Sequence, residues 1–188
     1  MEYGSRIRRM DVMLIDPNTV SRGNLGALIR DFGCYLVRPF DDPEIAVVSI
    51  LSKPPAVVLC NWGTDGAMVR QVLDQIRNHR NDEVARTPII AVAQNLNRQI
   101  TSNALKAGIT QVLASPVVPA DLMKKLIFVL TDQRQMLRRE GRLTYVANLK
   151  KSKLIKPVPV PKVLEFPAAS VTPTPRAADA EPDDVLEL

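Results

Sequence analysis

Short apolar runs alternate with longer segments of helical periodicity over the first 130 or so residues. The runs have no internal alternation of polar positions, which is typical of strands buried on both faces of a sheet. The expected strands cover residues 11–15, 34–37, 56–60, 88–93 and 112–114, and the expected helices cover 18–32, 42–51, 66–79, 97–107 and a last segment from 119 onward. This order predicts an α/β fold, a doubly wound five-stranded parallel sheet with helices on both faces.

The helical pattern of the last segment continues past residue 132, through Met136 and Leu137, to a first breaker at Gly141. We therefore expect the last helix to run to about residue 138 and to extend beyond the sheet. Its apolar seam could contribute to a homodimer.

Charge and proline divide the chain into three parts. Residues 1–133 carry 15 basic and 13 acidic side chains, residues 134–156 carry 8 and 1, and residues 157–188 carry 2 and 6. The last part also holds 7 of the 15 prolines, which remove amide donors and oppose helices and central strands. We predict a folded domain over 9–132, a basic helical extension or linker over 133–156 and an acidic, proline-rich disordered tail over 157–188.

The excess of basic residues is thus concentrated in residues 134–156, and three interpretations of this basic segment remain open. It could be a solvated linker, a docking segment for an acidic protein, or a nonspecific contact to nucleic acid or another polyanion. No recognition-helix pattern or stacking aromatics indicate sequence-specific DNA binding. The candidate contact residues are Arg134, Arg138, Arg139, Arg142, Lys150 and Lys151.

Composition excludes several other classes of protein. Two cysteines and one histidine cannot supply a disulfide framework or most zinc sites. No apolar run is long enough to span a bilayer, and the N-terminus lacks the apolar stretch of a signal peptide. We therefore expect a cytoplasmic protein without a membrane span.

Function in a doubly wound sheet is expected just beyond the carboxyl ends of the strands. The residues at those places are Asp16, Pro17, Asn61, Trp62, Ala93, Gln94, Ser115 and Pro116. They include one carboxylate and no histidine, lysine or cysteine. The DPNTVSRGN segment after the first strand has no glycine-rich phosphate loop, which argues against a nucleotide-binding enzyme.

The chain resembles the receiver domain of response regulators, the CheY-like module of two-component signalling, which has a flavodoxin-like sheet. The segments that carry the resemblance are LIDPNTVSRGNLGALIRDFG, VVLCNW followed by DG, PIIAVAQN and ALKAGITQVLASPV. The resemblance implies a magnesium ion held by three carboxylates, one of which accepts a phosphoryl group. It also implies a hydroxyl group and a lysine that bind the phosphoryl oxygens.

Most of these parts are replaced in this chain. The acidic pair becomes Asp16-Pro17, the phosphoacceptor position is Asn61, the hydroxyl position is Ala93, and the lysine position is Ser115, which keeps its neighbour Pro116. An amide cannot attack a phosphoryl group, and Asp16 is at most a residual metal ligand. We expect no cofactor, no magnesium and no enzymatic activity.

Asn61 could instead hydrogen-bond to Asp16 and hold the pocket in one state. The sequence thus favours a pseudo-receiver that acts through protein contacts in phosphorelay signalling, with a kinase or another regulator as partner. The alternative is a regulator associated with nucleic acid or another polyanion through the basic extension.

Overall fold

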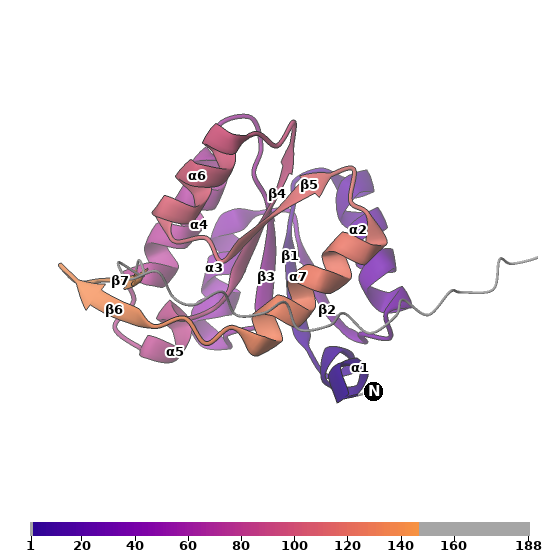
Figure 1. Cartoon of the computed structure of the whole chain (residues 1–188), viewed down its shortest axis with the longest axis horizontal. Coiled ribbons are helices and arrows are strands. Elements are labelled where there is room, and N and C mark those ends of the chain that lie inside the picture. Colours follow the sequence, from indigo (N-terminus) through magenta and orange to yellow (C-terminus); the bar gives the residue numbers. More distant parts are fainter. Residues whose placement is uncertain (1, 147–188) are drawn as a thin grey trace, which may run out of the picture. The chain divides into compact units, whose positions relative to one another are not determined.

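The computed structural model describes residues 2–146, and its centre is a five-stranded parallel sheet (Figure 1). The strands lie in the order β2-β1-β3-β4-β5, and every neighbouring pair is parallel. Their bounds are β1 Asp11–Ile15, β2 Leu36–Phe40, β3 Val57–Asn61, β4 Ile89–Gln94 and β5 Gln111–Ser115. The predicted doubly wound sheet is confirmed.

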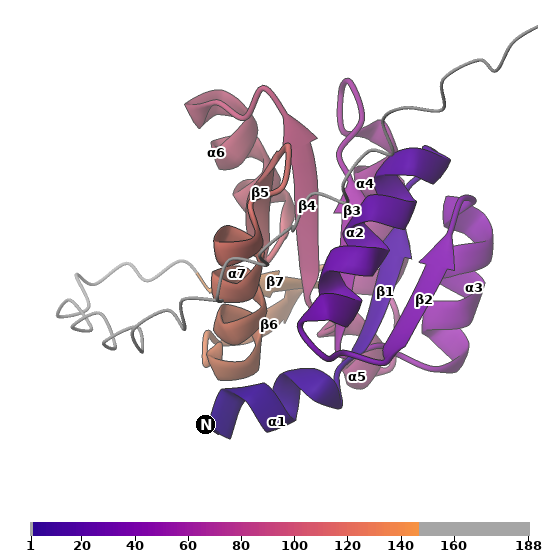
Figure 2. The ribbon, with the colours of Figure 1, turned by 90° about the vertical axis from the view of Figure 1, so that its right-hand side faces the viewer.

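Helices cover both faces of this sheet (Figure 2). One face carries α3 (Pro43–Ser52), α4 (Ala67–Arg77) and α6 (Arg98–Ala107), and the other carries α1 (Glu2–Arg8), α2 (Thr19–Asp31) and α7 (Pro119–Thr131). A short helix, α5 (Asp82–Ala85), precedes β4. None of the helices within residues 2–146 is long and apolar enough to cross a membrane.

The central strands are apolar along their length because both of their faces are covered. Four of the five residues of β1, four of the five of β3 and five of the six of β4 are buried. Local signals then fix where the helices begin. Asn18 caps α2 by accepting a hydrogen bond from the amide of Ser21, and Asp42 caps α3, whose first residue is Pro43.

The second strand lies two residues later than the 34–37 expected. The amide of Cys34 donates to the carbonyl of Ile29 in α2 at 3.4 Å, and its buried Sγ donates to the carbonyl of Met10 at 3.1 Å, so this residue still belongs to the connection after α2. Pro39 is accommodated because β2 is an edge strand. The carbonyl of Phe40 accepts a hydrogen bond from the amide of Asp16, so the backbone of Phe40 faces β1. The backbone of the preceding residue, Pro39, therefore faces the open edge, where its missing N–H leaves no hydrogen bond between strands unmade.

The prediction that the last helix extends to about residue 138 is wrong. α7 ends at Thr131, whose hydroxyl donates to the carbonyl of Ile127 at 3.0 Å. A hairpin follows, made of β6 (Met136–Arg139) and antiparallel β7 (Arg142–Tyr145). Glu140 and Gly141 between them both have positive φ, 48° and 82°, as a two-residue hairpin turn with matching twist requires.

This correction shortens the apolar seam on which the expected homodimer through the last helix rested, and that homodimer stays a prediction. Leu122 and Leu126 are buried, and Val129 and Leu130 pack against the same cluster, so the apolar seam of α7 is used within the domain. The remainder of the 133–156 extension and the whole 157–188 tail lie outside the described residues.

Candidate functional site

Asp16 lies at the carboxyl end of β1 and is the buried centre of a small polar cluster. Only 5% of its surface is exposed. Its Oδ1 accepts one hydrogen bond from the main-chain amide of Asn18 at 2.9 Å and another from Nδ2 of Asn61 at 2.9 Å. The carboxylate is therefore held by neutral donors from its own loop and from the end of β3.

The orientation of the Asn61 amide is fixed from both sides. Its Oδ1 accepts from the main-chain amide of Gly63 at 2.8 Å, so its Nδ2 must face Asp16. The hydrogen bond expected between Asn61 and Asp16 is therefore present. Asp65 lies two residues before α4 and is exposed, and its Oδ1 accepts a hydrogen bond from the main-chain amide of Ala67, the first residue of that helix.

A cation that the sequence reasoning missed also contacts this cluster. The guanidinium group of Arg22, one turn into α2, donates to the main-chain carbonyl of Asp16. The helix cap at Asn18 sets the position of that turn, but nothing in the spacing of charges indicated that Arg22 would point back over the strand end. Arg22 thus brings a positively charged side chain to the main chain of the residue that carries the only carboxylate of the cluster.

The other predicted positions lie at the same edge of the sheet without joining the cluster. Ala93 is buried near the end of β4, Ser115 ends β5 and is half-buried, and Pro17 and Pro116 are exposed. The Ser115–Pro116 peptide bond is cis. Within residues 2–146, the one side-chain hydrogen bond between two predicted site residues joins Asn61 to Asp16.

Trp62 closes the end of β3. The residue is 5% exposed, and its main-chain amide donates to the carbonyl of Val92 at 2.7 Å. The indole lies directly against Gly66, the residue before α4, where a Cβ atom would come within 2.4 Å of ring carbons. This buried position identifies Trp62 as a lid on the strand end rather than a binding surface.

The described residues bring together few possible metal ligands. Between residues 2 and 146, no three histidine, cysteine, aspartate or glutamate side chains are placed so that they could hold a metal ion together. Around Asp16 the possible ligands are one carboxylate and one amide, and the amide nitrogen faces the carboxylate. This donor set fits magnesium poorly, because the ion prefers several oxygen ligands at octahedral positions.

Both cysteines are buried thiols. Burial raises the pKa of Cys34, and burial together with the charge of Asp16 raises the pKa of Cys60 to about 12. Since the thiolate is the reactive form, we expect neither cysteine to react with iodoacetamide at neutral pH in the folded protein, and both to react after unfolding in guanidinium. Mass spectrometry of the labelled chain measures this, and rapid labelling of either cysteine in the native protein would contradict it.

Three of the arginines predicted to contact a partner or a polyanion instead attach the β6–β7 hairpin to the domain. Arg138 binds the carboxylate of Asp82 at 2.7 Å, and Arg142 binds that of Asp74. Arg134 binds Asp132 at 2.7 Å and the carbonyl of Thr110 at 3.1 Å.

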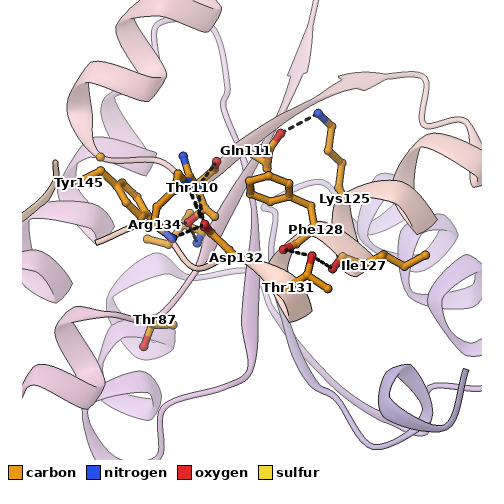
Figure 3. A network of polar contacts seen from close by, with 12 residues as sticks. Thr87, Thr110, Gln111, Lys125, Ile127, Phe128, Thr131, Asp132, Arg134 and Tyr145 are labelled. Atoms are coloured by element: carbon orange, nitrogen blue, oxygen red, sulfur yellow. Dashed lines mark hydrogen bonds and ion pairs between the residues drawn. The ribbon is translucent and has the colours of Figure 1, made fainter. Parts of the chain in front are cut away.

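Arg134 lies between the rings of Tyr145 and Phe128 (Figure 3), and its Cζ is 4.2 Å from the centroid of the first ring and 5.1 Å from that of the second. Arg139 is exposed on the hairpin, while Lys150 and Lys151 lie outside the described residues. Polyanion binding by the basic extension therefore stays a prediction, with less free charge to support it than the sequence suggested.

The sequence matches no family model and no curated protein. Solved structures do match. The receiver domain of a sensor histidine kinase from Pseudomonas aeruginosa, with magnesium in its active-site cleft, is 26% identical with a TM-score of 0.57, over 65% of this chain and 98% of that chain.

The chemotaxis protein CheY4 of Vibrio cholerae is 21% identical with a TM-score of 0.53, over 63% and 96% of the two chains. A response regulator from Desulfuromonas acetoxidans is 18% identical with a TM-score of 0.53, over 64% and 95%. These similarities confirm the fold that the resemblance implied.

Proposed function

Because the chain has the fold of response-regulator receiver domains, we propose that it is a pseudo-receiver. It takes part in two-component or phosphorelay signalling through protein contacts and independently of phosphorylation. It transfers no phosphoryl group and acts in the cytoplasm, where a kinase or another regulator is its partner.

The observation that carries this proposal is the hydrogen bond between Asn61 and Asp16. An aspartate at position 61 could attack phosphorus, but the amide of Asn61 carries no negative charge, and its two ends are hydrogen-bonded to Asp16 and Gly63, so it is too weak a nucleophile for this attack. The lost hydroxyl at Ala93 and the lost lysine at Ser115 remove the groups that would neutralise a bound phosphoryl group.

A groove along β5 supports the part of the proposal that concerns protein contacts. It has a volume of about 470 Å³ and lies between the α6 side and α7, with Leu96, Val112, Lys124, Lys125 and Phe128 among its lining residues. The resemblance implies that receiver domains bind partners at this face. Val112 stands where the family often has a switching aromatic ring, so the face would be presented in one permanent state.

Incubation with labelled acetyl phosphate tests the loss of phosphoryl transfer. We expect no labelling of the wild-type chain, because Asn61 replaces the acceptor and the one carboxylate at the strand ends, Asp16, is buried and hydrogen-bonded to Asn18 and Asn61. Asp65→Asn is the matched control, since Asp65 is the carboxylate nearest to Asn61 along the chain. Stable incorporation that survives substitution of serine and threonine residues would overturn the proposal, and its loss in Asp65→Asn would identify the acceptor.

Asn61→Asp tests the same site from the opposite direction. A second carboxylate would lie within hydrogen-bonding distance of Asp16, where the two negative charges repel unless a cation lies between them. We expect millimolar Mg²⁺ to raise the melting temperature of this variant and to leave that of the wild type unchanged. Thermal unfolding followed by the fluorescence of Trp62 measures both, and an equal Mg²⁺ effect on the wild type would contradict the proposal.

A further inference from the structure

The outer side of α3 carries an apolar stripe that the described chain does not cover. Ile45, Val48 and Leu51 are 59%, 69% and 36% exposed. In Figure 2, α3 lies at the right-hand edge of the molecule beside β2, and no other labelled element lies outside it. The spacing of three residues sets the side chains along a ridge inclined to the helix axis, which is the geometry by which helices pack together.

A shallow hollow of about 440 Å³ lies next to the end of this stripe. Its wall is formed by Leu51 of α3 and by residues at and after the end of α4, namely Gln75, Asn78, His79 and Arg80. The exposed ridge is thus followed by a depression on the same side of the helix. A face with both a ridge and a depression is complementary to a second copy of itself, because the ridge of each copy can pack beside the depression of the other.

Opposite charges lie at the two ends of the stripe. Glu44 is exposed in the first turn of α3, and Lys53 is exposed directly after its last residue. Neither side chain has an ion-pair partner among residues 2–146. The face is therefore negative at one end, positive at the other and apolar between them.

We propose that this face binds a second copy of the chain about a two-fold axis that passes through Val48. When the two copies of α3 run antiparallel, such an axis places each residue before Val48 at the same height along the helix as the residue equally far after Val48 in the second copy. Ile45 of one copy then lies over Leu51 of the other, beside the hollow. Glu44 then lies over Ser52 and Lys53 of the second copy, so the two unpaired charges meet twice.

The neighbouring strand edge does not offer a competing way to pair two copies. β2 is an edge strand, and Pro39 faces its open side. Proline at such a position opposes pairing with another strand. The outer face of α3 is therefore the self-complementary surface on this side of the described domain. The opposite charges of Glu44 and Lys53 at its two ends favour a second copy of the chain over an unrelated apolar partner.

A contact made by one helix face, with three apolar side chains and the charges at its ends, is smaller than a standard protein–protein interface. We therefore expect the dimer to be weak and concentration-dependent. Sedimentation velocity of the full chain over a wide range of concentrations measures it. Val48→Asp sets two like charges against each other on the axis, and we expect the dissociation constant to rise by at least about tenfold. Val20→Asp is the matched control, because Val20 is 72% exposed on α2, outside the face, and should leave the dimer unchanged.

Charge reversal and cross-linking test the symmetry itself. Glu44→Lys should weaken the dimer, and adding Lys53→Glu should restore it. Val48→Cys should cross-link two copies under mild oxidation, since the natural cysteines are buried. A wild type that stays monomeric throughout would overturn the proposal and leave the face to a different protein. A dimer that Val48→Asp leaves intact would overturn it as well.

Discussion

Arg77→Ala is expected to lower the free energy of unfolding by about 3–5 kcal/mol, because three buried carbonyl groups lose their donor and a cavity remains. Arg77 ends α4 and is completely buried. Its guanidinium donates to the carbonyls of Ala85 at 2.6 Å, Thr87 at 2.9 Å and Gly108 at 3.1 Å. One side chain thus joins α4 to α5, to the segment before β4 and to the end of α6.

Burying the charge of Arg77 reduces the stability that its hydrogen bonds contribute, but does not cancel it. Burial lowers the pKa of this guanidinium to about 10, which still leaves it charged at neutral pH. Its hydrogen bonds to carbonyls offset the cost of taking that charge out of water, so truncation to alanine loses the bonds together with the packing of the aliphatic part.

Chemical denaturation compares Arg77→Ala with two other variants. Arg70→Ala changes the same residue type on the same helix, but Arg70 is exposed and binds only the carbonyl of Asp65. We expect it to cost less than about 1 kcal/mol. Arg77→Lys should lie in between, because a single ammonium cannot reach all three carbonyls. An unfolding free energy of Arg77→Ala within about 1 kcal/mol of the wild type would contradict this account.

The burial of Arg77 was not predictable from local pattern. A basic residue in the last turn of an amphipathic helix is typically solvated and favoured by the helix dipole. It is buried here because α5 and the β6–β7 hairpin lie nearby: Ala85 belongs to the same small cluster as Met136 and Leu143. The sequence alone did not indicate either of these elements.

The hairpin escaped prediction because two patterns compete in the same segment. Met136 and Leu137 continue the helical spacing of α7, which suggested a longer helix. The carboxylate of Asp132 accepts hydrogen bonds from the amide and the guanidinium of Arg134, and this local bonding ends the helix first. Stacking of Arg134 on Tyr145 then connects residues that are far apart on any helix.

The sheet was predictable because its signals are local. Continuous apolar runs mark the strands, and Asn18, Asp42 and Pro119 mark where helices begin. At the candidate site, the identities at positions 61, 93 and 115 could be read directly. The contacts of Arg22 and Gly63 depend on the path of loops, which no periodic pattern encodes.

Gly66→Ala is expected to destabilise the domain by about 2–4 kcal/mol, for two separable reasons. Gly66 has a φ of 74°, a left-handed conformation that costs any other residue free energy. A Cβ atom there would also lie 2.4 Å from two carbons of the Trp62 indole, so the ring must move. Because Trp62 is the single tryptophan, this movement should shift the emission of the folded protein.

Gly63→Ala separates the two causes. Gly63 also has a positive φ, 67°, but nothing lies within 4 Å of the place its Cβ would take. It should cost only the backbone term, about 1 kcal/mol, and leave the emission unchanged. In a chain that already carries Trp62→Ala, Gly66→Ala should cost no more unfolding free energy than Gly63→Ala does, because the ring that its Cβ would meet is gone. Equal losses from Gly63→Ala and Gly66→Ala in the presence of Trp62 would show that the indole does not pack on this glycine, and Trp62 would then not act as the lid of the strand end.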